Sequence, residues 1–319
     1  LLNNSFKRYQ SIMQNKVFSV LNYIGHKSKI IEQINSHLPT TLNGTFWDMF
    51  SGSGVVGLSV DFNNVEFVDN NSHLQHFMQN LSDPTFISIT ETMLSNYGFT
   101  NSSKKPRSEY LKDPNIGTCT WHGKTVSNMH LDSLNKAPYS QLISDYNANK
   151  FSGLAKACAY YILTIYGRNS NVSVNKKNNL AGGVGPLDFG PRAKSKVKRY
   201  QEIIRTKNVQ FSQGDYFNFK PLKGDFVYMD PPYLASSFTY GGWTEDDERR
   251  LLKWIDDLPC AWALSNTFTS GTKSNIILQE WAKTKNVVFI QKKYRKWASK
   301  GKATATKKVK KNKEVLILP

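Results

Sequence analysis

The 319-residue sequence predicts an α/β fold organised around a parallel sheet. The stretch "GTFWDMFSGSGVVGLSV", residues 44–60, has the pattern of a strand, a Gly and Ser turn and an apolar helix, and "VEFVDNN" follows at once as a second strand. After about residue 205, short apolar strands again alternate with helices. Strands joined by helices in this way pair in parallel within one sheet.

The first part, residues 1–83, begins with polar residues. The stretch "NKVFSVLNYIGHKSKIIEQINSHLP" then predicts a loop that carries Tyr23 and Lys27, followed by a helix that ends at Pro39. The strand, turn and helix of residues 44–60 come next.

Gly52, Gly54 and Asp69 are suited to a nucleotide-like ligand. Both glycines lie between a strand and a helix, where the backbone can approach a ligand closely and the helix N-terminus favours an anionic group, although many glycines simply make turns. Asp69 ends the next strand, where its carboxylate is placed to accept both hydroxyls of a ribose. The alternative for Asp69 is a helix N-cap.

Residues 84–205 predict a separate insertion that is partly helical and partly loop. Its hydrophobic alternation is weak, and the one strongly apolar helix is "LAKACAYYILTIYG". The following "NVSVNKKNNLAGGVGPLDFGPRAKSK" has no helical period.

Residues 206–319 return to strands and helices. In "DFVYMDPPY" the two prolines end a buried strand and leave the Asp230 carboxylate at its carboxyl end, the edge where α/β sheets bind ligands. "TEDDERRLLKWIDDL" predicts a helix with Thr244 as its N-cap. The later elements are the strand "CAWALSNT", the helix "NIILQEWAKT" and the strands "NVVFIQKKY" and "KEVLILP".

The charge of the chain indicates a polyanionic partner. Lys and Arg number 42 against 24 Asp and Glu, which gives a net charge of +18 that folding does not require. A basic surface that confers only solubility is the alternative. The lysine-rich stretch 292–313 precedes a good strand, so we expect it to be a loop fixed at both ends by strands of the sheet. Its lysines either contact phosphates or are merely solvated.

Other function classes are disfavoured. Cys119, Cys158 and Cys260 are far apart in the sequence, which favours a reducing compartment and argues against a zinc site. His73 and His76 lack a partner at ligand spacing, so we expect ordinary surface or core histidines and no metal. No apolar run approaches the roughly 20 residues of a membrane span, and the first residues lack a signal peptide pattern, so a cytoplasmic protein is expected.

The ordered motifs resemble the Dam-like family of adenine-specific DNA methyltransferases. The motifs are "NYIGHKSKII", "FWDMFSGSG", "FVDNN", "QGDYFNF", "DFVYMDPPY", "ALSNT" and "KEVLIL", with the target-recognition insertion between the glycine loop and "DPPY". The resemblance implies a Rossmann-like sheet that binds S-adenosylmethionine, and methyl transfer to the exocyclic amino group of adenine in double-stranded DNA. Such an enzyme would be bacterial or phage-encoded, within a restriction-modification system or solitary. Nothing in the sequence selects an oligomeric state.

The resemblance also assigns cofactor residues. Lys27 would meet the cofactor carboxylate, Asp69 the ribose, and Asp215 the adenine. Tyr216 stands where the family commonly has Phe, a change that preserves stacking. The full set is Tyr23, Lys27, Phe50, Gly52, Gly54, Asp69, Asp215, Tyr216 and Asp230.

The catalytic residues that the resemblance implies are Asp230, Pro231, Pro232 and Tyr233. Hydrogen bonds from the adenine amino group to the Asp230 carboxylate and the Pro231 carbonyl would localise the nitrogen lone pair toward the methyl group. The base must be flipped out of the duplex, and Tyr233 would stack on it.

DNA contacts are expected in the insertion and the basic loop. Arg168, Asn169 and Asn171 are suited to base edges, but this region keeps only the outline of the pattern found in relatives that read GATC, so GATC recognition is in doubt. Phosphate contacts are expected from Lys194, Lys196, Lys198, Arg199, Lys292, Lys293 and Arg295.

Two other functions remain open. One is methyl transfer to RNA or to a protein amide, which Asp at position 230 and the basic insertion disfavour. The other is a DNA-binding module that has lost catalysis, which the presence of Lys27, Gly52, Asp69 and Asp230 disfavours.

Overall fold

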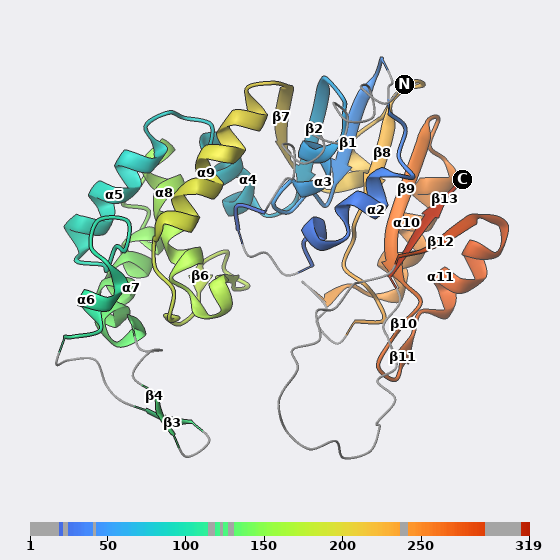
Figure 1. Cartoon of the computed structure of the whole chain (residues 1–319). Helices are drawn as coiled ribbons and strands as arrows, with labels where there is room; N and C mark the ends of the chain where they lie inside the picture. The colour runs from blue at the N-terminus through green and yellow to red at the C-terminus, as the bar shows by residue number, and fades with distance from the viewer. Residues whose placement is uncertain are drawn as a thin grey trace, which may run out of the picture. The chain divides into compact units, whose positions relative to one another are not determined.

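The structure is a computed structural model that describes residues 19–21, 25–40, 43–113, 119–121, 124–126, 131–236, 242–290 and 314–319. The chain forms two compact units, each built from two stretches of sequence (Figure 1). The sheet unit is Lys27–Asp69 with Gly214–Pro319, and the helical unit is Leu1–His26 with Asn70–Gln213. The insertion expected at residues 84–205 lies within the helical unit, which also includes the residues on either side of it.

A seven-stranded, mostly parallel sheet confirms the predicted fold class. The strand order is β12-β13-β9-β8-β1-β2-β7. Strands β2, β1, β8 and β9 run parallel, whereas β13 is antiparallel to both of its neighbours, β9 and β12. The strands are β1 (Thr45–Met49), β2 (Asn64–Asp69), β7 (Asn208–Gln213), β8 (Phe226–Met229), β9 (Ala261–Thr267), β12 (Asn286–Ile290) and β13 (Glu314–Leu318).

The helices of the sheet unit are short. They are η1 (Lys27–Lys29), α2 (Ile31–Asn35), α3 (Val55–Ser59), η4 (Tyr216–Asn218), α10 (Glu245–Asp256), α11 (Ile276–Trp281) and η6 (Ala282–Thr284), with a small hairpin of β10 (Thr269–Ser270) and β11 (Lys273–Ser274). The predicted cap of α10 is confirmed, because Thr244 Oγ1 accepts a hydrogen bond from Asp247 N at 3.2 Å and Asp247 Oδ2 accepts one from Thr244 N at 3.0 Å.

Alternation along the strands assigns side chains to two faces of this sheet. On one face Met49, Val227 and Leu264 pack in a single core with Leu251 of α10 and Leu278 of α11. The residues between them in sequence face the other way, because successive side chains of a strand point to opposite faces.

Helix α3 covers this second face at very short range. A Cβ atom added to Gly57 would lie 2.5 Å from the Phe67 ring, so only glycine allows the helix to pack this closely on β2. Gly57 N also donates to Asp48 Oδ2 at 2.9 Å. The third glycine of "GSGVVG" therefore serves packing.

The helical unit is built around the apolar helix that the sequence predicts. Helix α8 (Gly153–Ile165) contacts α4 (Ser72–Asn80), α5 (Phe86–Tyr97) and α7 (Leu131–Asn147) (Figure 1). Its Tyr161 ring stacks on Phe77 at 5.5 Å and meets the edge of Phe86 at 5.5 Å. The other elements are α6 (Arg107–Tyr110), η3 (Arg168–Ser170), α9 (Pro191–Ile204) and the hairpins β3 (Cys119–Trp121) with β4 (Lys124–Val126) and β5 (Ser173–Val174) with β6 (Leu180–Ala181).

Helix α9 corrects the expectation of irregular structure up to residue 196. It begins at Pro191, a residue favoured at the first position of a helix because its φ is already helical. Val197, Tyr200 and Ile204 are buried at helical spacing. Lys194, Lys196, Lys198 and Arg199 interrupt the apolar residues and hide this period from a search for apolar runs.

Among the residues that the structure describes, every helix is too short or too polar to cross a membrane.

Candidate active site

The carboxyl ends of β1, β2 and β8 bring three predicted groups to one edge of the sheet unit. Phe50 follows β1, Asp69 ends β2 and Asp230 follows β8. The neighbouring strands are in parallel register, with Asp48 opposite both Phe67 and Tyr228, so their ends fall together. This is the edge at which open α/β sheets bind ligands.

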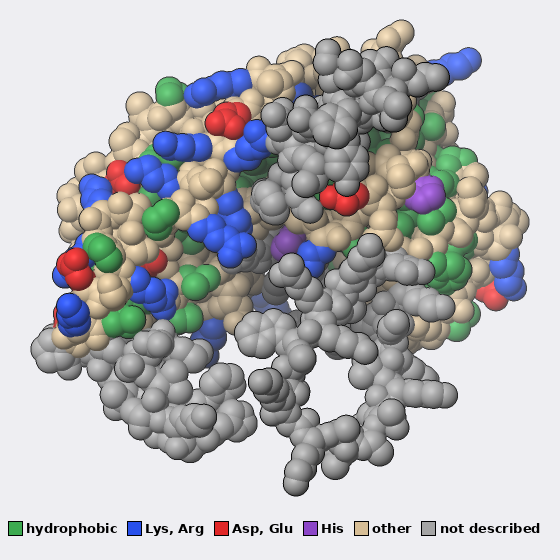
Figure 2. All heavy atoms as spheres, viewed as in Figure 1, with side chains coloured by type: hydrophobic (Ala, Val, Ile, Leu, Met, Phe, Trp, Pro, Cys, Tyr) green, Lys and Arg blue, Asp and Glu red, His purple; other side chains and the backbone are tan. Residues whose placement is uncertain are grey.

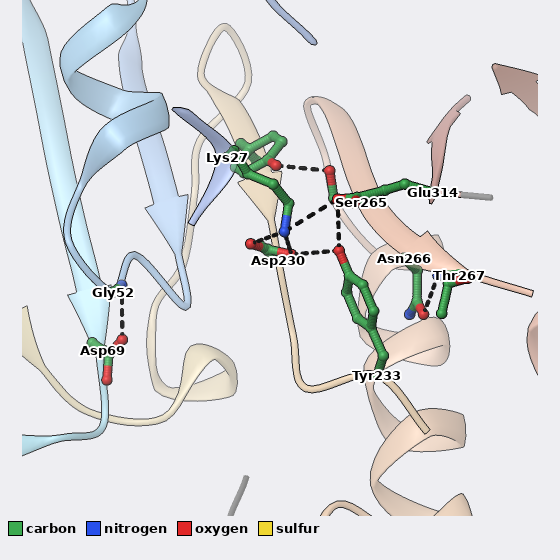
Figure 3. Close-up of polar contacts among 10 residues, drawn as sticks. Lys27, Gly52, Asp69, Asp230, Tyr233, Ser265, Asn266, Thr267 and Glu314 are labelled. Carbon is green, nitrogen blue, oxygen red and sulfur yellow. Dashed lines mark hydrogen bonds and ion pairs between the residues drawn. The ribbon is translucent and has the colours of Figure 1, made fainter. Parts of the chain in front are cut away.

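Asp230 lies at the centre of a charged cluster (Figure 3). Lys27 Nζ is 2.6 Å from Asp230 Oδ1 and 2.5 Å from Oδ2. Glu314 Oε1 is 3.2 Å from the same ammonium group. The Tyr233 hydroxyl lies 2.9 Å from Asp230 Oδ1 and 3.0 Å from Glu314 Oε1, and its single proton is shared between the two carboxylates.

Charge pairing compensates the burial of this cluster. The Lys27 and Glu314 side chains are 5% and 3% exposed, and Asp230 is 20% exposed. Burial lowers the pKa of Lys27, but the carboxylates of Asp230 and Glu314 raise it above its ordinary value, so the ammonium stays charged. Burial raises the pKa of Asp230. The positive charge of Lys27 opposes this rise, and the negative charge of Glu314 adds to it.

The family resemblance implies a cofactor carboxylate as the partner of Lys27. In the structure its partners are the two protein carboxylates, and its ammonium lies 5.2 Å from the centre of the Tyr233 ring. Glu314 itself was not selected from the sequence. It is the first residue of β13, and because β13 runs antiparallel to β9, that residue lies beside Thr267 at the carboxyl end of β9.

The two prolines follow β8 outside any helix or strand. Pro231 is buried and Pro232 is half-buried. Asp230 N donates to Met49 O at 3.4 Å, and Ser236 N donates to Tyr233 O at 2.8 Å, which closes a turn. The fixed φ of proline limits the freedom of this segment between the two bonds.

The loop between β1 and α3 has the backbone expected of a ligand-binding turn. Gly52 and Gly54 have φ values of 51° and 66°, in the left-handed region that glycine adopts without strain, and Phe50 has a φ of 60°. Gly52 N donates to Asp69 Oδ2 at 2.9 Å (Figure 3). The N-cap of α4 is Asn71, which accepts from Leu74 N at 3.1 Å, so the capping role considered for Asp69 belongs to Asn71.

Aromatic rings surround Phe50. Its ring centre lies 5.3 Å from that of Tyr216 and 5.9 Å from that of Trp243. Trp243 Nε1 donates to the buried Glu248 at 2.7 Å, which fixes the indole. Trp243 was missed in the sequence analysis, because a lone tryptophan before a helix has no distinctive pattern.

Asp215 occupies the N-cap position of η4, next to Tyr216. Burial raises its pKa, and the Arg250 guanidinium nearby opposes the rise. Arg250 also lies 4.9 Å from the centre of the Phe217 ring.

The helical unit holds the residues expected to read bases. Arg168 and Asn169 are exposed, and Asn171 is half-buried. Asn169 adopts a φ of 58°, and Arg168 N donates to Gly183 O at 2.8 Å, so the backbone of this turn is held from a neighbouring segment.

The expected phosphate contacts of α9 differ in their surroundings. Lys194 pairs with Glu91 at 3.1 Å and Arg199 with Glu202 at 3.4 Å, whereas Lys198 is exposed. Burial and the nearby Arg192 lower the pKa of Lys196.

Figure 2 shows Lys and Arg side chains spread over the face of the helical unit, with fewer acidic ones. Four predicted residues lie outside the described residues: Tyr23, Lys292, Lys293 and Arg295.

A hairpin that the sequence analysis did not single out as a structural element presents two exposed lysines. Strands β5 and β6 enclose residues 175–179, with Lys176 and Lys177 exposed. Asn147 holds the hairpin from α7, because its side chain accepts from Leu180 N and donates to Leu180 O, both at 2.9 Å.

His73 holds the same hairpin from α4. Its Nε2 lies 2.9 Å from Asn178 O, and its Nδ1 lies 2.9 Å from the Tyr146 hydroxyl. Within the described part of the chain, no group of His, Cys, Asp or Glu side chains is arranged to hold a metal ion.

Comparison with known proteins decides between the families compatible with this site. Residues 23–298 match the model of the D12 class N6 adenine-specific DNA methyltransferases. The chain belongs to this family. The match includes Lys27, Asp230 and Tyr233, the glycine loop, and residues 70–213 of the helical unit of the D12 class protein.

The D12 class chain is also similar to three modification enzymes. It is 28% identical over 317 residues to the type II methyltransferase M.FokI of Planomicrobium okeanokoites, covering 92% of this chain and 43% of that protein. It is 27% identical to the modification methylase StsI of Streptococcus sanguinis, covering 84% and 38%, and 25% identical to the modification methylase LlaI of Lactococcus lactis subsp. lactis, covering 82% and 39%. The chain thus spans about two fifths of the length of these relatives.

Proposed function

We propose that this chain transfers a methyl group from S-adenosylmethionine to the exocyclic amino group of adenine at a specific sequence in duplex DNA. The observation that carries the proposal is the Asp230 carboxylate, which is partly buried at the carboxyl end of β8, with Lys27 and Tyr233 within hydrogen-bond distance. Membership of the D12 class family supports the choice of adenine in DNA.

The residues at this edge fit S-adenosylmethionine. Asp69 provides a carboxylate for ribose hydroxyls, the loop at Gly52 and Gly54 allows close backbone approach, and Phe50 and Tyr216 provide aromatic faces for an adenine ring. When bound, this cofactor supplies a methyl group on a positively charged sulfur.

Asp230 and the Pro231 carbonyl are proposed to accept the two N–H bonds of the adenine amino group. These acceptors localise the lone pair on that nitrogen, whose electrons form the new C–N bond while the C–S electron pair passes to sulfur. The nitrogen then releases one proton to Asp230 or to solvent. The acceptors stabilise charge that develops in the transition state, which is where an enzyme gains rate.

Tyr233 is proposed to stack on the flipped base. Its hydroxyl is anchored by Asp230 and Glu314, so the ring is held in one orientation. A target base inside a duplex cannot reach this edge, and extrusion of the base exposes both of its faces for stacking.

The helical unit and the basic loop are proposed to bind the DNA. Arg168, Asn169 and Asn171 carry the side chains that pair best with base edges, and the exposed Lys198 is suited to phosphates. The residues of the 292–313 loop are proposed to add phosphate contacts that do not depend on sequence. The similar proteins are named as modification enzymes, which supports a role in a restriction-modification system.

The test is incubation of unmethylated plasmid DNA with the protein and S-adenosylmethionine, followed by sequencing that detects methylated bases. We expect N6-methyladenine in one sequence context. Parallel reactions with RNA and with a protein extract separate the alternatives. Methyl transfer only to RNA or protein, or none to any substrate, would contradict the proposal.

A further inference from the structure

Glu314 is a buried carboxylate that reaches the site from the last strand. Its side chain is 3% exposed, and its Oε1 contacts both the Lys27 ammonium and the Tyr233 hydroxyl (Figure 3). A carboxylate removed from water costs several kcal/mol unless it is paired, so packing alone does not favour Glu at this position.

The Lys27 ammonium occupies both oxygens of Asp230 in the structure. The two distances, 2.6 Å and 2.5 Å, are those of strong charge-assisted hydrogen bonds. An amino group that donates to Asp230 must compete with them. Lys27 therefore needs a second counter-ion close by if Asp230 is to accept from a substrate while the lysine stays charged.

Glu314 meets that requirement. It lies 3.2 Å from Lys27 Nζ, so a small movement of the ammonium exchanges one carboxylate for the other. It also accepts the Tyr233 hydroxyl, which keeps the ring oriented when the bond to Asp230 is given up.

We propose that Glu314 is a positioning residue, which holds Lys27 and Tyr233 when Asp230 accepts the amino group of the target adenine. This inference rests on the proposed function, and it adds a residue that acts through two others and touches no substrate.

Steady-state kinetics of Glu314→Gln on plasmid DNA test the role. We expect kcat to fall about 10- to 100-fold, as for a reacting group held slightly out of place. Affinity for S-adenosylmethionine should change less than about twofold, which separates positioning from cofactor binding. Glu66→Gln is the matched control, since Glu66 is also a buried glutamate but lies within β2 rather than at its end, and its kcat should stay near wild type.

The pH profile gives a readout that a purely structural role would not move. The Glu314 charge raises the pKa of Asp230, so its neutral replacement should move the acid limb of kcat to lower pH. Glu314→Asp keeps the negative charge, but its shorter side chain withdraws the carboxylate from Lys27 and Tyr233. We therefore expect kcat to fall while the acid limb of the pH profile stays in place. This variant also replaces Glu314→Gln if that protein does not fold.

A double-mutant cycle tests the role of Glu314 through stability and needs no activity. If the wild type methylates no DNA, the proposed function is contradicted, but the cycle still tests the contact between Glu314 and Tyr233. Urea midpoints of wild type, Tyr233→Phe, Glu314→Met and the double variant should be non-additive, because the two side chains share one hydrogen bond and Met lacks the carboxylate oxygen that accepts it. Additive midpoints would overturn the inference. So would wild-type kcat in both Glu314→Gln and Glu314→Asp of a protein that methylates DNA.

Discussion

Lys27 and Asp230 are separated by 203 positions in the sequence and form a direct ion pair. Lys27 opens the short helix before α2, and Asp230 follows the buried strand β8. The pair therefore joins the first and second stretches of the sheet unit at the edge where its ligands are expected. Because the ammonium is 5% exposed, its charge depends on the carboxylates beside it.

Replacement of Lys27 should destabilise the protein. Lys27→Met leaves Asp230 and Glu314 without their shared cation, and breaking a buried pair in this way costs about 3–5 kcal/mol of unfolding free energy. Lys29→Met is the control, because Lys29 is exposed in the same helical turn and surface changes stay within about 0.5 kcal/mol. Urea denaturation measures both. Equal stabilities of the two variants would show that the ion pair contributes nothing.

Removal of the Asp69 carboxylate should weaken cofactor binding. Asp69→Asn loses the charge-assisted hydrogen bonds that we propose to the ribose hydroxyls, and weakens the one from Gly52 N. Each such bond is worth about 1.5–3 kcal/mol, which corresponds to roughly 10- to 100-fold in affinity. Calorimetry with S-adenosylmethionine measures the loss, and DNA affinity should stay unchanged. Asn71→Ala removes the nearby cap of α4 and should keep cofactor affinity. If Asp69→Asn binds S-adenosylmethionine as tightly as wild type, the carboxylate only fixes the loop through its hydrogen bond from Gly52 N.

His73 should make stability depend on pH. Burial lowers the pKa of His73 below its ordinary 6.5, and the positive charges of Lys156 and His76 lower it further, whereas the Asn178 carbonyl opposes the shift. The folded protein thus binds this proton less tightly than the unfolded chain. The stabilisation is complete above about pH 6.5 and is lost as the pH falls below it.

Urea denaturation at about pH 7.5 and pH 5.5 tests this effect of His73. A loss of at most about 1.4 kcal/mol is expected, because pH 5.5 lies one pH unit below the ordinary pKa of 6.5. His73→Gln does not titrate, so it should lose less stability than wild type between the two pH values. His37→Gln, at an exposed histidine, should behave like wild type. A parallel response of all three proteins would show that His73 does not titrate in this range.

Thr244→Ala should weaken helix α10. The variant removes the oxygen that accepts from Asp247 N, and loss of such a cap costs about 1 kcal/mol of stability. Thr244→Ser keeps the oxygen and should remain close to wild type. Thermal unfolding followed by circular dichroism compares the three, and equal midpoints for Ala and Ser would contradict the capping assignment.

The sheet and its ligand edge could be predicted from the sequence because their signals are local. Apolar strands such as Phe226–Met229, the glycines at 52 and 54 and the prolines after Asp230 each constrain the backbone within a few residues. The Thr244 cap is equally local, since all its atoms lie within one helical turn.

The other features depend on contacts between distant residues. Glu314 reaches the site only because β13 runs antiparallel, and a strand sequence does not encode its direction. The anchors of the β5–β6 hairpin, His73 and Asn147, lie on separate helices. Helix α9 was missed because its lysines interrupt a buried stripe of three residues.

Methyl transfer by Asp230→Ala tests the proposed role of the Asp230 carboxylate in methylation. The wild type and the variant are incubated with unmethylated plasmid and S-adenosylmethionine, and N6-methyladenine is quantified by mass spectrometry of the digested DNA. Calorimetry with the cofactor and circular dichroism confirm that the variant folds and binds. We expect N6-methyladenine with wild type and none above background with Asp230→Ala. Near-wild-type methylation by the folded variant would contradict the assignment of Asp230 as the acceptor for the adenine amino group.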